Sequence, residues 1–136
     1  KGGNWNLLMK NLEFLSMLRA RNEIKFLRLD FVVQDHNYRE MIDFVTLGEK
    51  FNADEVFFQK VVNWGYYTEE EFSQRAIYNE KHPHYLHFLH ILSHPDLKKN
   101  IVNVGNLGHF FNNRNRNNSY NLKNAIRDSV KNFLSR

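Results

Sequence analysis

The chain has 136 residues, of which 42% are hydrophobic and 15% aromatic, enough to build the core of one domain and to argue against wholesale disorder. It contains no cysteine, which excludes disulfides, thiolate zinc sites and cysteine-ligated iron–sulfur clusters within this chain. The formal net charge of +4 belongs to the C-terminus, because residues 1–111 hold thirteen basic and fourteen acidic residues. Nucleic-acid binding by the main body is therefore not expected.

No apolar run approaches the ~20 residues that span a bilayer, and the first residues do not resemble a signal peptide. We therefore expect no membrane partner and a cytoplasmic location. The chain begins at Lys1 rather than at a methionine, which favours a trimmed or incomplete chain.

The first half of the chain predicts a helix, a strand and a second helix. Apolar residues recur every three or four positions over 4–22, which indicates an amphipathic helix. They are Trp5, Leu8, Leu12, Leu15 and Leu18. Residues 25–34 are aromatic and aliphatic and predict a strand. The next helix is expected to begin at Asn37, whose side chain would accept the backbone N–H of Glu40 in a capping box, and to end near Phe51.

The second half predicts a strand, two helices and a short strand. Residues 55–64 predict a strand, and Thr68 with Glu71 forms a capping box for a helix through about residue 79. Pro83 suits the first turn of a further helix, which Pro95 limits. Residues 101–104 predict a short strand. The strand and helix order favours an α/β fold with parallel strands joined by crossover helices.

We expect two parts, a domain over residues 1–111 and a C-terminal segment over 112–136. The segment opens with an Asn-rich linker and continues as a basic amphipathic helix. This helix is expected to dock its apolar face on the domain; contact with acidic lipid or nucleic acid is the alternative.

The two longer strands carry polar residues where a covered parallel strand should be apolar. Buried polar groups without partners cost about 1–3 kcal/mol, so the pattern predicts a wet cavity or a paired internal network. In barrels the carboxyl ends of the strands form the ligand site, which selects Gln34, Asn37, Gln59 and Asn63. The alternative is an edge strand with one solvated face.

Six short motifs resemble radical S-adenosylmethionine enzymes, in particular the branch with a cysteine-rich C-terminal extension for auxiliary clusters. They are Lys1-Gly-Gly-Asn-Trp5, Phe31-Val-Val-Gln34 with Asn37 and Glu40-Met41, Phe57-Phe58 with Asn63-Trp64-Gly65, Thr68-Glu-Glu-Glu71, His82-Pro83, and Asn103-Val-Gly-Asn106. The resemblance covers roughly residues 1–108 and depends on the order and spacing of the motifs together.

The resemblance implies the C-terminal half of a partial (β/α)6 TIM-like barrel, from its fourth to its sixth helix. It implies that Gln34 and Asn37 approach S-adenosylmethionine, and that Gln59, Asn63 and Trp64 line the substrate side. The family's [4Fe–4S] cluster is held by three cysteines near the first strand, which this chain lacks. The missing N-terminal half of the barrel is therefore the expected partner. The segment alone is expected to be inactive, and the substrate would be a small molecule or a peptide.

Three further interpretations stay open. A degenerate barrel fragment would instead be a non-catalytic module that binds a partner or a peptide. Trp64 with Tyr66 and Tyr67 forms either an aromatic platform for a ligand or packing under a loop. Five histidines lie close together, and a helix would place pairs of them on one face for a metal ion. They are His82, His84, His87, His90 and His94. No His-Glu-x-x-His pattern is present, so we predict solvated histidines and no metal site.

Overall fold

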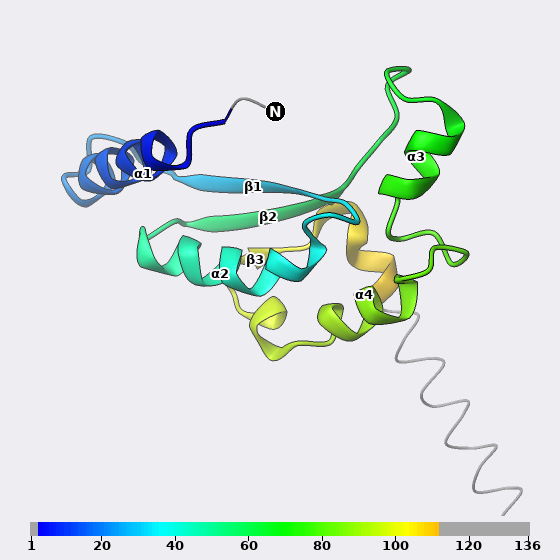
Figure 1. Cartoon of the computed structure of the whole chain (residues 1–136). Helices are drawn as coiled ribbons and strands as arrows, with labels where there is room; N and C mark the ends of the chain where they lie inside the picture. The colour runs from blue at the N-terminus through cyan, green and yellow to red at the C-terminus, as the bar shows by residue number, and fades with distance from the viewer. Residues whose placement is uncertain (1–2, 112–136) are drawn as a thin grey trace, which may run out of the picture.

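A three-stranded parallel sheet forms the centre of the fold (Figure 1), as seen in a computed structural model that describes residues 3–111. The strands are β1 (Arg28–Val33), β2 (Glu55–Lys60) and β3 (Val102–Asn103), in the order β1-β2-β3. The mixed α/β class and the parallel strands predicted above are confirmed. The segment 112–136, with its predicted helix, lies outside the described residues.

Helices lie before, between and after the strands, and those that cover the sheet lie on one of its faces (Figure 1). They are α1 (Trp5–Ala20), η1 (Tyr38–Glu40), α2 (Met41–Lys50), α3 (Glu69–Arg75), α4 (Tyr85–Leu92), η2 (Pro95–Lys98) and η3 (Gly105–Leu107). In Figure 1, α2 and α4 lie below the sheet and α1 lies at its left end. None of the helices in residues 3–111 has the length and apolar composition needed to cross a membrane.

The core lies between the sheet and these helices. Leu29 and Val33 of β1 and Val56 and Phe58 of β2 are buried on the covered face. Helix α2 approaches β2 closely because Gly48 has no side chain, and a β-carbon there would meet a methyl group of Val56. The core therefore depends on a small residue at the helix–strand crossing.

The opposite face of the sheet is polar. Arg28 and Asp30 are exposed and form an ion pair, with the Arg28 Nε 3.0 Å from an Asp30 carboxylate oxygen. The guanidinium carbon of Arg28 lies 4.9 Å from the centre of the Phe57 ring. Among the described residues no helix covers Arg28 or Asp30, so β1 has one covered and one open face. This open polar face fits both alternatives from the sequence, the inner surface of a barrel and an edge strand with one solvated face.

Helix α1 packs through Leu12 in a small apolar cluster with Leu29, and an ion pair holds its C-terminal end. Asp54 accepts hydrogen bonds from Arg19 Nε at 2.8 Å, from Arg19 Nη2 at 2.7 Å and from the backbone N–H of Leu27 at 2.8 Å. The hydrogen bond from Arg19 is the largest cause of a lowered pKa of Asp54, about 2. At the other end of α1, Trp5 is 61% exposed, so the predicted apolar stripe packs only in part.

Several predicted boundaries are corrected by local hydrogen bonds. The capping box at Asn37 is wrong, because the Asn37 side chain binds the backbone of residues 32 and 34 instead, and α2 begins at Met41. The box at Thr68 and Glu71 is confirmed in both directions. Helix α3 ends at Arg75 rather than near residue 79. Pro83 precedes α4, whose N-cap is residue 84.

Candidate functional site

A hollow of about 400 Å³ lies where the chain leaves β1 and β2. Because the two strands are parallel and adjacent, the segments that follow them emerge at the same edge of the sheet. We call this hollow the carboxyl-end pocket. Its lining includes Gln34, Gln59, Lys60, Trp64, Tyr66 and Tyr67, together with three valines. Three of the five residues predicted from the sequence therefore line one pocket.

The loop after β2 holds two aromatic rings out toward solvent. Asn63 Oδ1 accepts the backbone N–H of Gly65 at 2.9 Å and that of Tyr67 at 3.2 Å, and Asn63 Nδ2 donates to the Tyr67 carbonyl at 2.9 Å. Gly65 adopts a φ of 89°, which favours glycine. Within this turn Trp64 is 81% exposed and Tyr66 is 88% exposed. Exposed rings beside a pocket are available to stack on a flat ligand. The interpretation of Trp64 as packing under the loop is therefore wrong.

The two asparagines predicted as ligand contacts have hydrogen bonds within their own loops. Asn37 Oδ1 accepts the backbone N–H of Gln34 at 2.8 Å, and Asn37 Nδ2 donates to the Val32 carbonyl at 3.0 Å. Asn63 holds the loop described above. In this structure both residues shape the pocket, and their contact with a cofactor or substrate stays a prediction.

Arg75 contacts two residues that line this pocket, although it lies on the neighbouring hollow and the sequence did not indicate it. Arg75 Nη1 donates to Gln34 Oε1 at 3.3 Å, and its guanidinium carbon lies 4.6 Å from the centre of the Tyr67 ring. The backbone carbonyl of Arg75 also accepts the N–H of Asp35 at 3.0 Å. Arg75 lies 41 positions from Gln34, at the end of α3, so only the folded chain brings them together.

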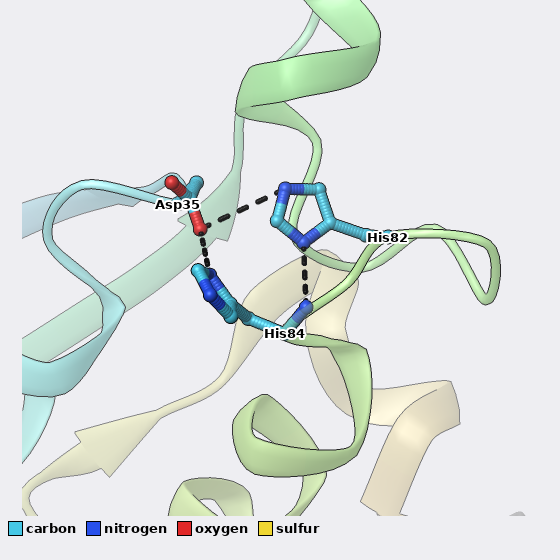
Figure 2. Close-up of side chains that lie close together, drawn as sticks. All are labelled: Asp35, His82 and His84. Atoms are coloured by element: carbon cyan, nitrogen blue, oxygen red, sulfur yellow. Dashed lines mark hydrogen bonds and ion pairs between the residues drawn. The ribbon is translucent and has the colours of Figure 1, made fainter.

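A second polar cluster joins the loop after β1 to the loop before α4 (Figure 2). Asp35 Oδ1 lies 2.8 Å from His84 Nδ1 and 3.7 Å from His82 Nε2. The three residues are spaced so that they could share a metal ion, and they border a hollow of about 510 Å³. Whether this cluster can bind a metal ion depends on the hydrogen bonds that its side chains already make.

The hydrogen bonds of His82 do not fit a preformed metal site. Its Nδ1 accepts the backbone N–H of His84 at 3.2 Å, which leaves the ring proton on Nε2. Nε2 then donates to the Gln74 carbonyl at 3.1 Å. A metal on Nε2 would move the proton to Nδ1 and break both bonds. The His82 side chain is only 6% exposed, so water would not readily replace them. The cluster is better described as a hydrogen-bonded connection between two loops.

The predicted histidine pairs are also engaged elsewhere. His87 Nδ1 lies 2.7 Å from the hydroxyl of the buried Tyr38, and His94 Nδ1 accepts the backbone N–H of Asp96 at 3.3 Å. Within residues 3–111, neither His90 nor His94 belongs to a group of three metal-ligand side chains. The carboxyl-end pocket is the better functional candidate, because it gathers three of the predicted residues beside two exposed aromatic rings.

Comparison with protein-family models, curated proteins and solved structures finds no match to this chain. The pocket and the sequence motifs are therefore the observations that bear on function.

Proposed function

We propose that this chain is the C-terminal half of a cytoplasmic radical S-adenosylmethionine barrel. In this proposal the carboxyl-end pocket forms part of the wall of the cavity for S-adenosylmethionine and substrate. The observation that carries the proposal is that Gln34, Gln59 and Trp64, at or just after the carboxyl ends of two adjacent parallel strands, line one pocket. Ligands of parallel α/β folds bind at this edge of the sheet.

The pocket has the chemistry to bind S-adenosylmethionine but not its iron–sulfur partner. Trp64 and Tyr66 offer rings for stacking on adenine, and Gln34 and Gln59 offer amides for hydrogen bonds to polar groups. The chain has no cysteine to ligate a [4Fe–4S] cluster, so the cluster ligands belong to the other half of the barrel. With a reduced cluster, bound S-adenosylmethionine supplies a 5′-deoxyadenosyl radical that modifies a small molecule or a peptide. The residues described here bind and orient the ligands.

The uncovered parts of the sheet also support the proposal. β1 is an edge strand in the described part of the chain, and its exposed face carries Arg28 and Asp30. A preceding barrel strand would pair with β1 and enclose this polar face. The half-barrel explains why one face is apolar and covered while the other is polar and open.

The decisive experiment extends the chain with the residues encoded upstream of Lys1 and reconstitutes it with iron and sulfide under anaerobic conditions. The proposal predicts cluster absorbance and release of 5′-deoxyadenosine from S-adenosylmethionine. A Gln34→Ala, Gln59→Ala double variant should keep the absorbance and lose most of the release. Absence of both signals in the extended parent chain would refute the proposal.

An apolar groove favours a second candidate, a module that binds a protein or a peptide. A hollow of about 370 Å³ lies between α1 and α2 beside the open edge of β1. Its lining combines the apolar Trp5, Phe31, Phe44 and Leu47 with the acidic Glu40 and Asp43. The upstream gene separates the two functions: an in-frame three-cysteine motif supports the enzyme, whereas a start codon at this point supports the module.

A further inference from the structure

An apolar surface between α1 and α2 has no cover in the described part of the chain. Phe31 and Phe44 lie there with ring centroids 4.7 Å apart, and both side chains are only partly buried. Together with Leu47 they line the hollow of about 370 Å³ described above, which we call the α1–α2 groove. Phe31 also packs on Phe58 on the covered side of the sheet, so this groove is separate from the carboxyl-end pocket. An open apolar groove of this kind is typical of a docking site.

Two carboxylates without partners line the same groove. Glu40 and Asp43 are exposed, and within residues 3–111 neither carboxylate has a hydrogen-bond or ion-pair partner. At the other end of α2, by contrast, a carboxylate oxygen of Glu49 lies 2.9 Å from Lys99 Nζ. Acidic residues in the first turn favour the helix itself, and here they also give the groove a net negative charge. A segment that is both apolar and basic would match this groove.

The residues that follow the described part of the chain have this composition. Residues 112–136 hold six basic residues and one acidic residue. Leu122, Ile126, Val130 and Phe133 recur at three- and four-residue spacing, which predicts an amphipathic helix with one apolar stripe. An apolar stripe among basic side chains complements the groove both in its apolar surface and in its charge.

The C-terminal segment also starts close enough to reach the groove. The Phe110 ring packs on Phe88 with centroids 5.9 Å apart, and Phe88 packs on Tyr38 with centroids 6.2 Å apart. Tyr38 begins the short turn that leads through Glu40 into α2, so the described chain ends two ring contacts away from the acidic end of this helix. The Asn-rich residues 112–119 can span about 26 Å when extended, which leaves the rest of the segment free to lie along the groove.

We infer that the α1–α2 groove is the docking site of the chain's own C-terminal segment, residues 120–136. The apolar stripe of the segment packs on the aromatic and aliphatic side chains of the groove, and its basic side chains pair with the two carboxylates. The inference is independent of the barrel proposal, because it involves neither the carboxyl-end pocket nor a cofactor. It gives the groove an occupant within the chain, which an external peptide would have to displace.

Paramagnetic broadening of NMR signals, measured on the full 136-residue chain, tests the inference. Because the chain has no cysteine, an Asn124→Cys variant carries a single spin label at a polar position of the segment. We expect broadening of the backbone amide signals of Phe44 and Leu47. The amides of α3 should change little, since α3 lies apart from α1 and α2 in Figure 1. The same variant with a diamagnetic label gives the reference intensities.

Charge variants in this labelled chain test the ion pairing. Glu40→Gln combined with Asp43→Asn should lower the docking equilibrium constant about fivefold, the effect of two surface ion pairs. Higher ionic strength should weaken docking in the same direction. Glu69→Gln combined with Glu70→Gln is the matched control, because it removes two carboxylates from the first turn of α3 and should leave docking unchanged. The amide spectrum of the other residues shows in each sample that the variant is folded.

A second pair of variants tests the apolar stripe. Ile126→Ser should lower the docking equilibrium constant by at least about tenfold, because the segment loses an aliphatic side chain that docking buries. Ala125→Ser is the matched control, since residue 125 does not belong to the apolar stripe and its replacement should leave the broadening unchanged.

Absence of broadening at Phe44 and Leu47, or equal broadening over all described residues, overturns the inference. An unchanged groove signal in Ile126→Ser overturns it as well, and unchanged docking without the two carboxylates overturns the ion pairing. A mixture of isotope-labelled chain without the spin label and spin-labelled chain without the isotope separates the remaining occupant. Broadening of the groove signals in that mixture would place the segment of a second copy there and overturn docking within one chain.

Discussion

The hydrogen bond between Tyr38 and His87 allows a sharp test of the packing between the first crossover and α4. Tyr38 is fully buried, and its hydroxyl lies 2.7 Å from His87 Nδ1. Burial raises the pKa of Tyr38, which keeps the hydroxyl protonated, so that it can donate to Nδ1 of His87. His87 lies on the exposed side of α4 and can be replaced without opening the core.

Removing the two ends of this bond should have unequal effects. Tyr38→Phe deletes both the donor and its need for a partner, and should lower the free energy of unfolding by about 1 kcal/mol. His87→Leu leaves the hydroxyl buried without an acceptor, and should cost about 1–3 kcal/mol. In the double variant no orphan hydroxyl remains, so its stability should return close to that of Tyr38→Phe. For a chain of this size, 1 kcal/mol corresponds to a change in melting temperature of about 4 °C.

Urea unfolding followed by far-ultraviolet circular dichroism, at low protein concentration, measures these free energies. Tyr66→Phe is the control, because a side chain that is 88% exposed should change stability by less than about 0.5 kcal/mol. If His87→Leu proves no more destabilising than Tyr38→Phe, the buried hydroxyl does not depend on the imidazole and the reasoning is refuted.

Three further predictions concern packing, acid stability and solution state. Gly48→Ala should cost about 1–3 kcal/mol in urea unfolding because its β-carbon meets Val56, and Val56→Ala in the same chain should recover part of the loss. The Asp54 pKa is lowered to about 2, so its carboxylate stabilises the fold above the unfolded pKa of about 3.9, and this contribution disappears as pH falls through about 2. Asp54→Asn should therefore be less stable than the wild type at pH 6 but should converge with it in acid-unfolding curves near pH 2. The isolated chain should self-associate through its open strand edge and exposed α1, and Trp5→Lys should reduce this; a monomer by light scattering at high concentration would contradict it.

The parallel sheet was predictable because it depends on local patterns. Alternation in residues 28–33 separates the buried Leu29 and Val33 from the exposed Arg28 and Asp30, and the helical segments between strands require crossovers. The place of the pocket followed from the same reasoning, since parallel strands bring the ends of β1 and β2 to one edge. These features need only the order of the elements and the period of each one.

Contacts between distant loops were not predictable in the same way. Arg75 reaches Gln34, and His84 reaches Asp35, through turns whose path depends on individual hydrogen bonds. The cap expected at Asn37 was missed for a similar reason. A 3₁₀ turn at residues 38–40 places the Asn37 side chain against the preceding backbone, and its competing local hydrogen bonds replace the helix cap.

The exposure of the tryptophans has a practical consequence for spectroscopy. The chain has two, Trp5 and Trp64, and both indole rings lie largely at the surface, so neither emission spectrum should shift much when the core melts. Trp64 would instead respond to whatever occupies the hollow beside it. In a Trp5→Phe variant, the fluorescence of Trp64 should therefore report ligand binding in this hollow and change little when the protein unfolds.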